Sequence, residues 1–341
     1  MSLPTGLEAF ARDVDRDFFA RELSSFVPER VFDAHCHLWP DRVYGPPETP
    51  RPLEGLRIDG GLAEYRALIR ALFPGRQLAA LFIPFWGTTG DVATANEWAA
   101  SQARQDPRCR HSFAVRPGDD PEWVRSQVRR LGARGLKCYH TFCAHQPTWE
   151  AEIPEYLPEP LVRVAHEEGL VITLHLVRRR AVADPSNRRW IREYCTRYPR
   201  MQLVLAHSAR AFQPAHAFEG LPHLRGLDNL WVDCSANCEP MAHAAALRLL
   251  GPERFLYGSD FFVSHLRGRS LAAGDSFLWL YESTPVWDEK HARLEPVLVG
   301  LEQLRSLKWA CWSERLSDAQ VEAVFWGNAA RLFYSPSSGA E

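Results

Sequence analysis

Apolar residues recur along the chain in eight short runs, each either alternating with polar residues or continuous, as in strands buried in a sheet. The runs cover residues 31–37, 77–85, 110–116, 133–139, 170–176, 202–207, 230–235 and 255–260. Segments with a helical spacing of apolar positions lie between them, at residues 62–73, 92–105, 121–131, 159–168, 187–198 and 240–250. Turn residues such as Gly75, Gly132 and Gly169 stand just before three of the strands.

This strict alternation of strands and helices predicts the fold class. Parallel strands joined by right-handed crossovers build either an open sheet or a closed barrel, and eight units match an α/β (β/α)8 TIM barrel better. We expect one such domain at residues 31–335. Residues 1–30 are expected to form a helical extension that closes the bottom of the barrel or meets another subunit of a homo-oligomer, and residues 336–341 a tail.

Two long segments interrupt the alternation. Residues 38–60 are rich in proline and follow the first strand, whereas residues 261–294 follow the eighth and carry aromatic residues at Phe277, Trp279, Tyr281 and Trp287. Both are longer than an ordinary βα loop, and both leave the edge at which barrels carry their active sites. They could be lids over a site or packed surface excursions.

Composition narrows the class of partner. The 341 residues include 40 Lys and Arg against 42 Asp and Glu, so the formal net charge is −2. Such a chain offers no field for nucleic acid, and a small-molecule substrate is expected. No apolar run reaches the ~18 residues of a membrane span, and charges occupy the positions where a secretory signal needs an apolar core, so we expect a cytoplasmic protein. The eight cysteines lack paired CxxC spacing, which indicates reduced thiols.

Histidines and one aspartate fall at the ends of the predicted strands. His35 and His37 are two residues apart on the first strand, so both side chains lie on one face. His175, His207 and Asp260 end the fifth, sixth and eighth strands. Since a barrel gathers the carboxyl ends of its strands on one face, these five side chains are expected to converge.

Three neutral imidazoles and one carboxylate favour a borderline divalent cation. Zinc prefers such donors and leaves a position for water, and manganese is the alternative. Four interior polar side chains without an ion would each carry a desolvation cost of roughly 1 to 3 kcal/mol. The sequence therefore predicts a metal site.

The motifs together resemble the metal-dependent amidohydrolase superfamily, most of all the amidohydrolase-related branch that contains aminocarboxymuconate-semialdehyde decarboxylase. The resemblance rests on the first strand's Asp-x-His-x-His, the histidines of strands five and six, the Tyr-Gly-Ser-Asp of strand eight and the late motif at 327–333. It implies that His35, His37, His175 and Asp260 are metal ligands, and that His207 is the acid/base residue or an electrophile beside the metal. In the late motif, Asn328 is expected to cap a helix.

Lys137 leaves the number of metals open. It is one of three lysines in the chain and stands at a barrel-facing position of strand four. In binuclear members of the superfamily such a lysine is carboxylated and bridges two metals, with His175 and His207 holding the second ion. In the single-metal branch it often stays free, and we expect one metal here. A free ammonium could also bind a substrate carboxylate or tune His175.

Three further residues are candidates for substrate binding. Arg178 and Arg210 follow strands five and six and could clamp a carboxylate, although each could equally be a solvated loop residue. Tyr139 ends strand four and could line the pocket.

The predicted site supports two reactions. A metal-activated water favours hydrolysis of a small amide, lactone or related carbonyl compound, with Asp260 taking the proton of the water and His207 stabilising the oxyanion or protonating the leaving group. The same residues could instead serve non-oxidative decarboxylation of an unsaturated or aromatic acid. A metal-binding scaffold without catalytic activity is the third, least favoured reading, and we expect a hydrolase.

Overall fold

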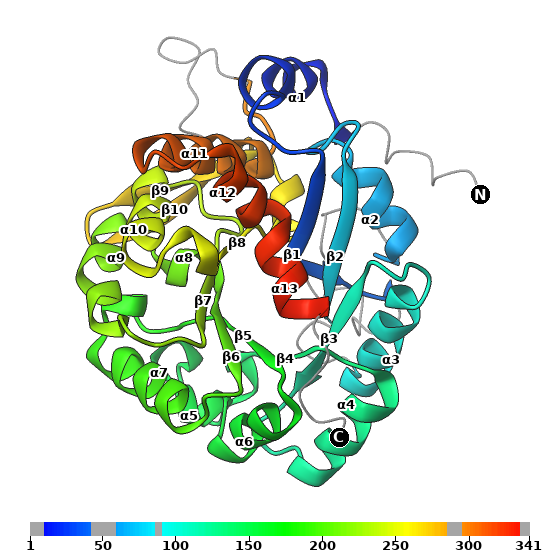
Figure 1. Cartoon of the computed structure of the whole chain (residues 1–341), viewed down its shortest axis with the longest axis vertical. Coiled ribbons are helices and arrows are strands. Elements are labelled where there is room, and N and C mark those ends of the chain that lie inside the picture. The colour runs from blue at the N-terminus through cyan, green and yellow to red at the C-terminus, as the bar shows by residue number, and fades with distance from the viewer. Residues whose placement is uncertain (1–9, 42–58, 86–90, 285–294, 335–341) are drawn as a thin grey trace.

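Eight parallel strands close into a barrel in the computed structural model, which describes residues 10–41, 59–85, 91–284 and 295–334. The strands pair in chain order (Figure 1): β1 Arg30–Leu38, β2 Gln77–Pro84, β3 Arg110–Val115, β4 Gly135–Cys138, β5 Val171–Leu174, β6 Gln202–Leu205, β7 Leu230–Asp233 and β8 Phe255–Leu256. The circle closes because the Ala34 amide donates to the Tyr257 carbonyl at 2.9 Å and the Asp260 amide to the His35 carbonyl at 2.8 Å. The predicted (β/α)8 barrel is confirmed.

Helices form the outer ring (Figure 1): α2 Leu62–Ile69, α3 Val92–Ala103, α4 Pro121–Leu131, α5 Ile153–Tyr156, α6 Glu159–Glu168, α7 Pro185–Arg197, α9 Pro214–Gly220, α10 Pro240–Leu250, α11 Val299–Ser313 and α12 Asp318–Glu322. Local sequence determines where several begin and end. Asp91, Asp120 and Asp184 accept amide hydrogen bonds at the starts of α3, α4 and α7. Gly132 and Gly169 end α4 and α6 in the left-handed region, with φ of 73° and 62°.

The bottom of the barrel is closed by α13, Asn328–Tyr334 (Figure 1). The N-terminal extension therefore lacks this role, one of the two expected for it, and the other, contact with another subunit, stays a prediction. Phe333 stacks on Phe32 of β1 at 5.4 Å between ring centroids, within the cluster that fills the lower barrel. Asn328 donates to the Phe255 carbonyl at 2.8 Å and so ties α13 to β8, which corrects its assignment as a cap. The extension, with α1 at Asp13–Phe18, lies beside α11 (Figure 1).

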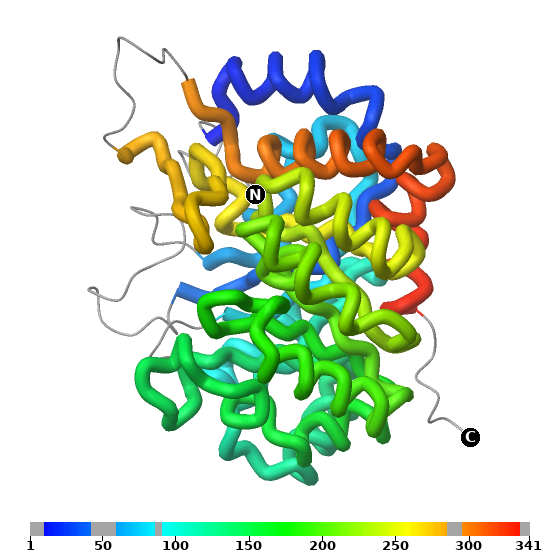
Figure 2. Tube along the Cα trace, turned by 90° about the vertical axis from the view of Figure 1, so that its left-hand side faces the viewer, coloured from blue at the N-terminus to red at the C-terminus, as the bar shows by residue number. Residues whose placement is uncertain are grey.

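Seven of the eight strands end one to four residues earlier than predicted, β8 earliest of all, and the long segment after β8 has structure of its own. Regular pairing stops at Leu205 in β6 and at Leu256 in β8. The segment after β8 contains an antiparallel hairpin, β9 Gly268–Ala273 and β10 Ser276–Tyr281, which projects on the side of the barrel toward which β1 runs (Figure 2). Residues 42–58 and 285–294, Trp287 among them, lie outside the described residues, and a lid role for the two segments stays a prediction.

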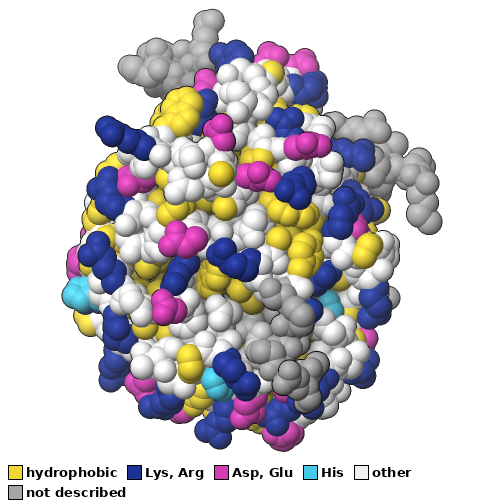
Figure 3. Space-filling view, viewed as in Figure 1, with side chains coloured by type: hydrophobic (Ala, Val, Ile, Leu, Met, Phe, Trp, Pro, Cys, Tyr) yellow, Lys and Arg dark blue, Asp and Glu magenta, His cyan; other side chains and the backbone are white. Residues whose placement is uncertain are grey.

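The surface charges, the cysteines and the lengths of the described helices fit the expectations drawn from composition. Basic and acidic side chains are interspersed over the face shown in Figure 3. All eight cysteines are buried and free, as predicted. Within the described ranges, every helix is too short or too polar to cross a bilayer.

Candidate metal centre

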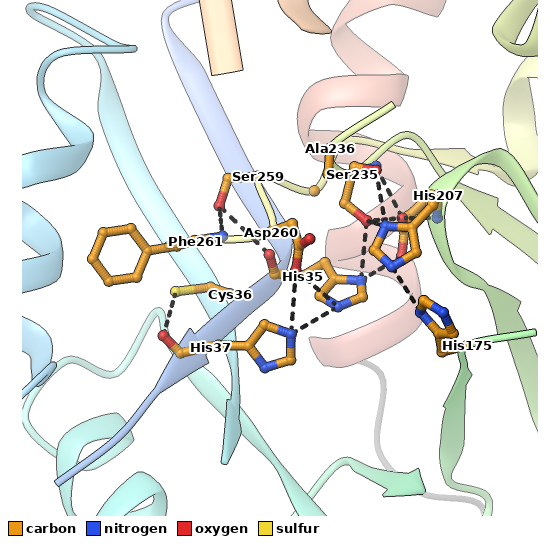
Figure 4. Close-up of polar contacts among 12 residues, drawn as sticks. His35, Cys36, His37, His175, His207, Ser235, Ala236, Ser259, Asp260 and Phe261 are labelled. Atoms are coloured by element: carbon orange, nitrogen blue, oxygen red, sulfur yellow. Dashed lines mark hydrogen bonds and ion pairs between the residues drawn. The ribbon is translucent and has the colours of Figure 1, made fainter. Parts of the chain in front are cut away.

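His35, His37 and Asp260 meet where β1 closes against the segment after β8 (Figure 4). The two Nε2 atoms of the histidines are 3.3 Å apart. Oδ1 of Asp260 lies 3.2 Å from Nε2 of His37 and 3.7 Å from Nε2 of His35. All three residues are buried, and in the described part of the chain no other His, Cys, Asp or Glu side chains form such a group of three.

A second pair of imidazoles lies beside this group. Nε2 of His207 is 3.1 Å from Nδ1 of His175, and the rings of His207 and His35 are 5.2 Å apart between centroids (Figure 4). All five predicted residues thus come to one neighbourhood, with His175 next to His207 and not within the group of three. Nε2 of His175 is buried and has no hydrogen-bond partner, so a ligand atom is available there.

The charges of the site suit a cation. Burial lowers the pKa of all four imidazoles, which leaves them neutral with a free lone pair each. Burial alone would raise the pKa of Asp260, but the hydrogen bond with His37 and the neighbouring imidazoles bring it well below the usual range. The site therefore presents neutral nitrogen donors around an ionised carboxylate, as zinc ligation requires.

Strained backbone places two of these side chains. Asp260 has a φ of 54°, and the turn after β6 has four successive residues in the left-handed region, from His207 at 60° to Arg210 at 53°. Non-glycine residues adopt this region at a cost of about 1–3 kcal/mol each, and such residues cluster at functional sites. The turn directs the His207 ring to the metal centre, although His207 lies beyond the strand in which it was predicted.

Asp33, at the base of the site, has a structural role. Its carboxylate accepts the amide of Ser259 at 2.8 Å, the Ser259 hydroxyl at 2.6 Å and the Tyr65 hydroxyl at 3.1 Å. Burial raises the pKa of Asp33 to about 7. These bonds hold the segment after β8 against β1 and thereby position Asp260.

Two residues of the site, Asp233 and Ser235, were not predicted. Asp233 ends β7 with its side chain fully buried, and its Oδ2 lies 2.9 Å from Nδ1 of His35. The Ser235 hydroxyl lies 2.9 Å from Nδ1 of His207. Their position at the carboxyl end of the seventh predicted strand was the signal in the sequence that could have identified them.

Strand β4 contributes Lys137 and leads into Tyr139. The Lys137 side chain is 1% exposed, its Nζ lies 5.3 Å from the centre of the Tyr139 ring, and burial lowers its pKa. The Tyr139 hydroxyl donates to the Pro84 carbonyl at 3.2 Å and lies 3.3 Å from Nδ1 of His37. Tyr139 therefore orients a member of the group of three.

The two candidate arginines differ in what holds them. The Arg178 guanidinium pairs with Asp184 at 3.1 Å and donates to the Glu150 carbonyl at 2.9 Å. Arg210 packs over Trp149, with 4.9 Å between the guanidinium carbon and the ring centre, and burial lowers its pKa to about 10. No carboxylate in the described ranges pairs with Arg210, so its charge remains available to an anionic ligand.

Gly258 allows the close approach of its segment to His35. A Cβ built on this glycine would lie 2.7 Å from the His35 Cβ. We expect Gly258→Ala to lower the free energy of unfolding by about 1–3 kcal/mol through overpacking, and to weaken zinc binding by displacing the His35 ring. Denaturant unfolding and a zinc titration measure the two effects. Gly118→Ala, whose Cβ would have no atom within 4 Å, is the matched control, and equal behaviour of both variants would contradict this account.

Comparison with known proteins shows the fold and the family of the chain. The chain resembles three solved structures, each covering 90% of it: a zinc-bound amidohydrolase from Burkholderia multivorans (19% identity, TM-score 0.55, 99% of that chain), a protein from Pseudomonas putida provisionally named a 2-pyrone-4,6-dicarboxylic acid hydrolase (18%, 0.55, 98%) and 5-carboxyvanillate decarboxylase from Sphingomonas paucimobilis (16%, 0.56, 99%). These identities show a shared fold. No curated protein matches the chain. The amidohydrolase family model matches residues 32–334, and the chain therefore belongs to the amidohydrolase family.

Proposed function

We propose that the protein is a metal-dependent hydrolase of a small amide, lactone or related carbonyl compound that carries a carboxylate. The observation that carries this proposal is the set of neutral, buried imidazoles around an ionised Asp260. His35, His37, His175 and Asp260 would hold one divalent ion, zinc in the first place and manganese as the alternative. The unpartnered Nε2 of His175 and the zinc bound to a fold neighbour support this donor set.

The side chains divide the work of hydrolysis between them. A bound divalent ion would polarise the substrate carbonyl and lower the pKa of a water toward ~7. Asp260 is placed to accept the proton of that water. His207, beside the group of three, is placed to stabilise the oxyanion or to protonate the leaving group. Arg210 offers its charge to the substrate carboxylate, and Lys137, Tyr139 and Arg178 remain candidates to line the pocket.

Decarboxylation of an unsaturated or aromatic acid is the second candidate. The likeness in fold to 5-carboxyvanillate decarboxylase favours this second candidate. In this reaction His207 would deliver a proton to carbon while carbon dioxide leaves, and no redox cofactor is needed.

Isotopes distinguish the two reactions. We would screen small lactones, amides and aromatic acids with the zinc-loaded enzyme in labelled water. Hydrolysis places oxygen-18 from the solvent in the product, whereas decarboxylation releases carbon dioxide and places solvent deuterium on carbon. Label in oxygen without release of carbon dioxide supports the first proposal, and the reverse result overturns it. Full zinc occupancy without turnover of any compound would favour the non-catalytic scaffold.

The number of metals depends on Lys137. We expect one ion per chain, with Lys137 uncarboxylated, because the described side chains form a single group of three ligands. Elemental analysis of the reconstituted enzyme, with and without bicarbonate, measures this directly. Two ions per chain, the second lost in Lys137→Ala, would instead establish a carboxylated bridge.

A further inference from the structure

Asp233 contacts both the His35 ring and the backbone of His207, and so links the two groups of imidazoles. Its Oδ2 faces Nδ1 of His35 at 2.9 Å. Its Oδ1 accepts the backbone amides of His207 at 2.9 Å and Ser235 at 3.0 Å, together with the Ser235 hydroxyl. Figure 4 shows Ser235 between the rings of His35 and His207. One buried carboxylate from β7 therefore contacts both a proposed metal ligand and the turn that carries His207.

These contacts determine which nitrogen of each ring carries hydrogen. Three donors converge on Oδ1 of Asp233, the amides of His207 and Ser235 and the Ser235 hydroxyl, and such an arrangement favours the ionised carboxylate, which can only accept. The hydrogen of the His35 ring must then sit on Nδ1, which leaves Nε2 bare toward His37 and Asp260. Nδ1 of His207 lies 2.9 Å from the Ser235 carbonyl, which also only accepts. Nδ1 of His207 must therefore carry the hydrogen of its ring, and Nε2 of His207 is unprotonated.

We infer that Asp233 is a positioning residue that holds His35 in the Nδ1-protonated tautomer and, through Ser235 and the His207 amide, aims His207 at the same point. The inference rests on the proposed function only where it concerns the effect of Asp233 on metal affinity. The tautomers themselves are a property of the metal-free chain.

Asp233→Asn gives a specific chemical test. Two backbone amides and one hydroxyl converge on Oδ1, so the oxygen of an asparagine is expected to remain there. Its amide nitrogen then faces His35 and donates a hydrogen where the carboxylate accepted one. The hydrogen of the His35 ring moves to Nε2, the atom needed for the metal. Loss of such an outer partner lowers metal affinity by about 10- to 100-fold.

The experiment uses metal-free full-length protein with ¹⁵N-labelled histidine. Two-bond proton–nitrogen spectra report the tautomer of each ring, with His35→Gln and His207→Gln used for assignment. We expect Nδ1-protonated His35 and His207 in the wild type and Nε2-protonated His35 in Asp233→Asn. Asp228→Asn is the matched control. This aspartate precedes β7 and its side chain is 92% exposed, so the rings of His35 and His207 should retain their tautomers in this variant.

A zinc titration against a chromophoric chelator completes the test, with a 10- to 100-fold loss expected for Asp233→Asn and less than a threefold change for Asp228→Asn. Nε2-protonated His35 in the wild type would overturn the inference even if no variant folds. An unchanged His35 tautomer in folded Asp233→Asn would overturn it as well. Wild-type protein that shows the expected tautomers but binds no zinc would instead refute the proposed function and leave the positioning role intact.

Discussion

Removal of the divalent metal is expected to abolish turnover, and His35→Ala is expected to prevent its recovery. Nε2 of His35 lies 3.3 Å from that of His37 and 3.7 Å from Oδ1 of Asp260, so the variant removes one donor from the only such group in the described residues. Loss of an outer partner alone costs 10- to 100-fold in metal affinity, and loss of a ligand should cost more than ~10²-fold. Elemental analysis and turnover after dialysis against chelator measure both effects.

Add-back and a matched variant complete this prediction. Zinc or manganese should restore the wild type, and neither should restore His35→Ala at concentrations that saturate the wild type. His223→Ala is the control, because this histidine is exposed on the turn that precedes β7. Full activity in a preparation shown to be free of metal would contradict the proposed mechanism.

Convergence of the clustered histidines and aspartate was predictable because it depends on strand geometry. Side chains two residues apart on a strand share a face, and barrel closure brings the first strand against the eighth. His35, His37 and Asp260 meet for these two reasons, and the closing hydrogen bond from Asp260 to the His35 carbonyl is part of the same arrangement. The alternation of apolar runs was sufficient to derive both.

Details that depend on tertiary contacts were not predictable from the pattern. Periodicity places His175 at the correct edge, but the contact with His207 depends on the left-handed turn after β6, which no glycine marks. Asp233 likewise ends a strand as an ordinary aspartate, and its role becomes visible only when His35, some 198 residues earlier in the chain, lies against it.

The sequence pattern left open whether the N-terminal extension closes the barrel bottom or meets another subunit, and it did not identify the C-terminal helix as the closing element, for a similar reason. Both ends of the chain carry amphipathic helical segments, and their patterns do not show which one fits the opening. Phe333 stacks on Phe32, and the amide of Asn328 reaches carbonyls beside β8. Both contacts depend on the shape of the opening and on the hydrogen-bond acceptors around it. The spacing of apolar residues along the chain contains no information about either.

His207→Asn is expected to lower kcat by about 10²- to 10⁴-fold while the metal stays bound. The substitution is conservative in two ways. Asparagine tolerates the φ of 60° at this position, and its side-chain amide can donate to the Ser235 carbonyl as Nδ1 of histidine does. It removes Nε2, the atom that faces the site. Since His207 is not one of the four proposed ligands, His35, His37, His175 and Asp260, the ion should remain.

Metal content, kcat and the pH profile separate this role from ligation. One limb of the profile should disappear if His207 transfers a proton, because no other group in the variant takes over that step. Wild-type turnover in His207→Asn would show that the ring has no part in the reaction. Loss of metal together with activity would show that His207 is a ligand, and with His175 only 3.1 Å away this result would point to a second ion held between those two rings.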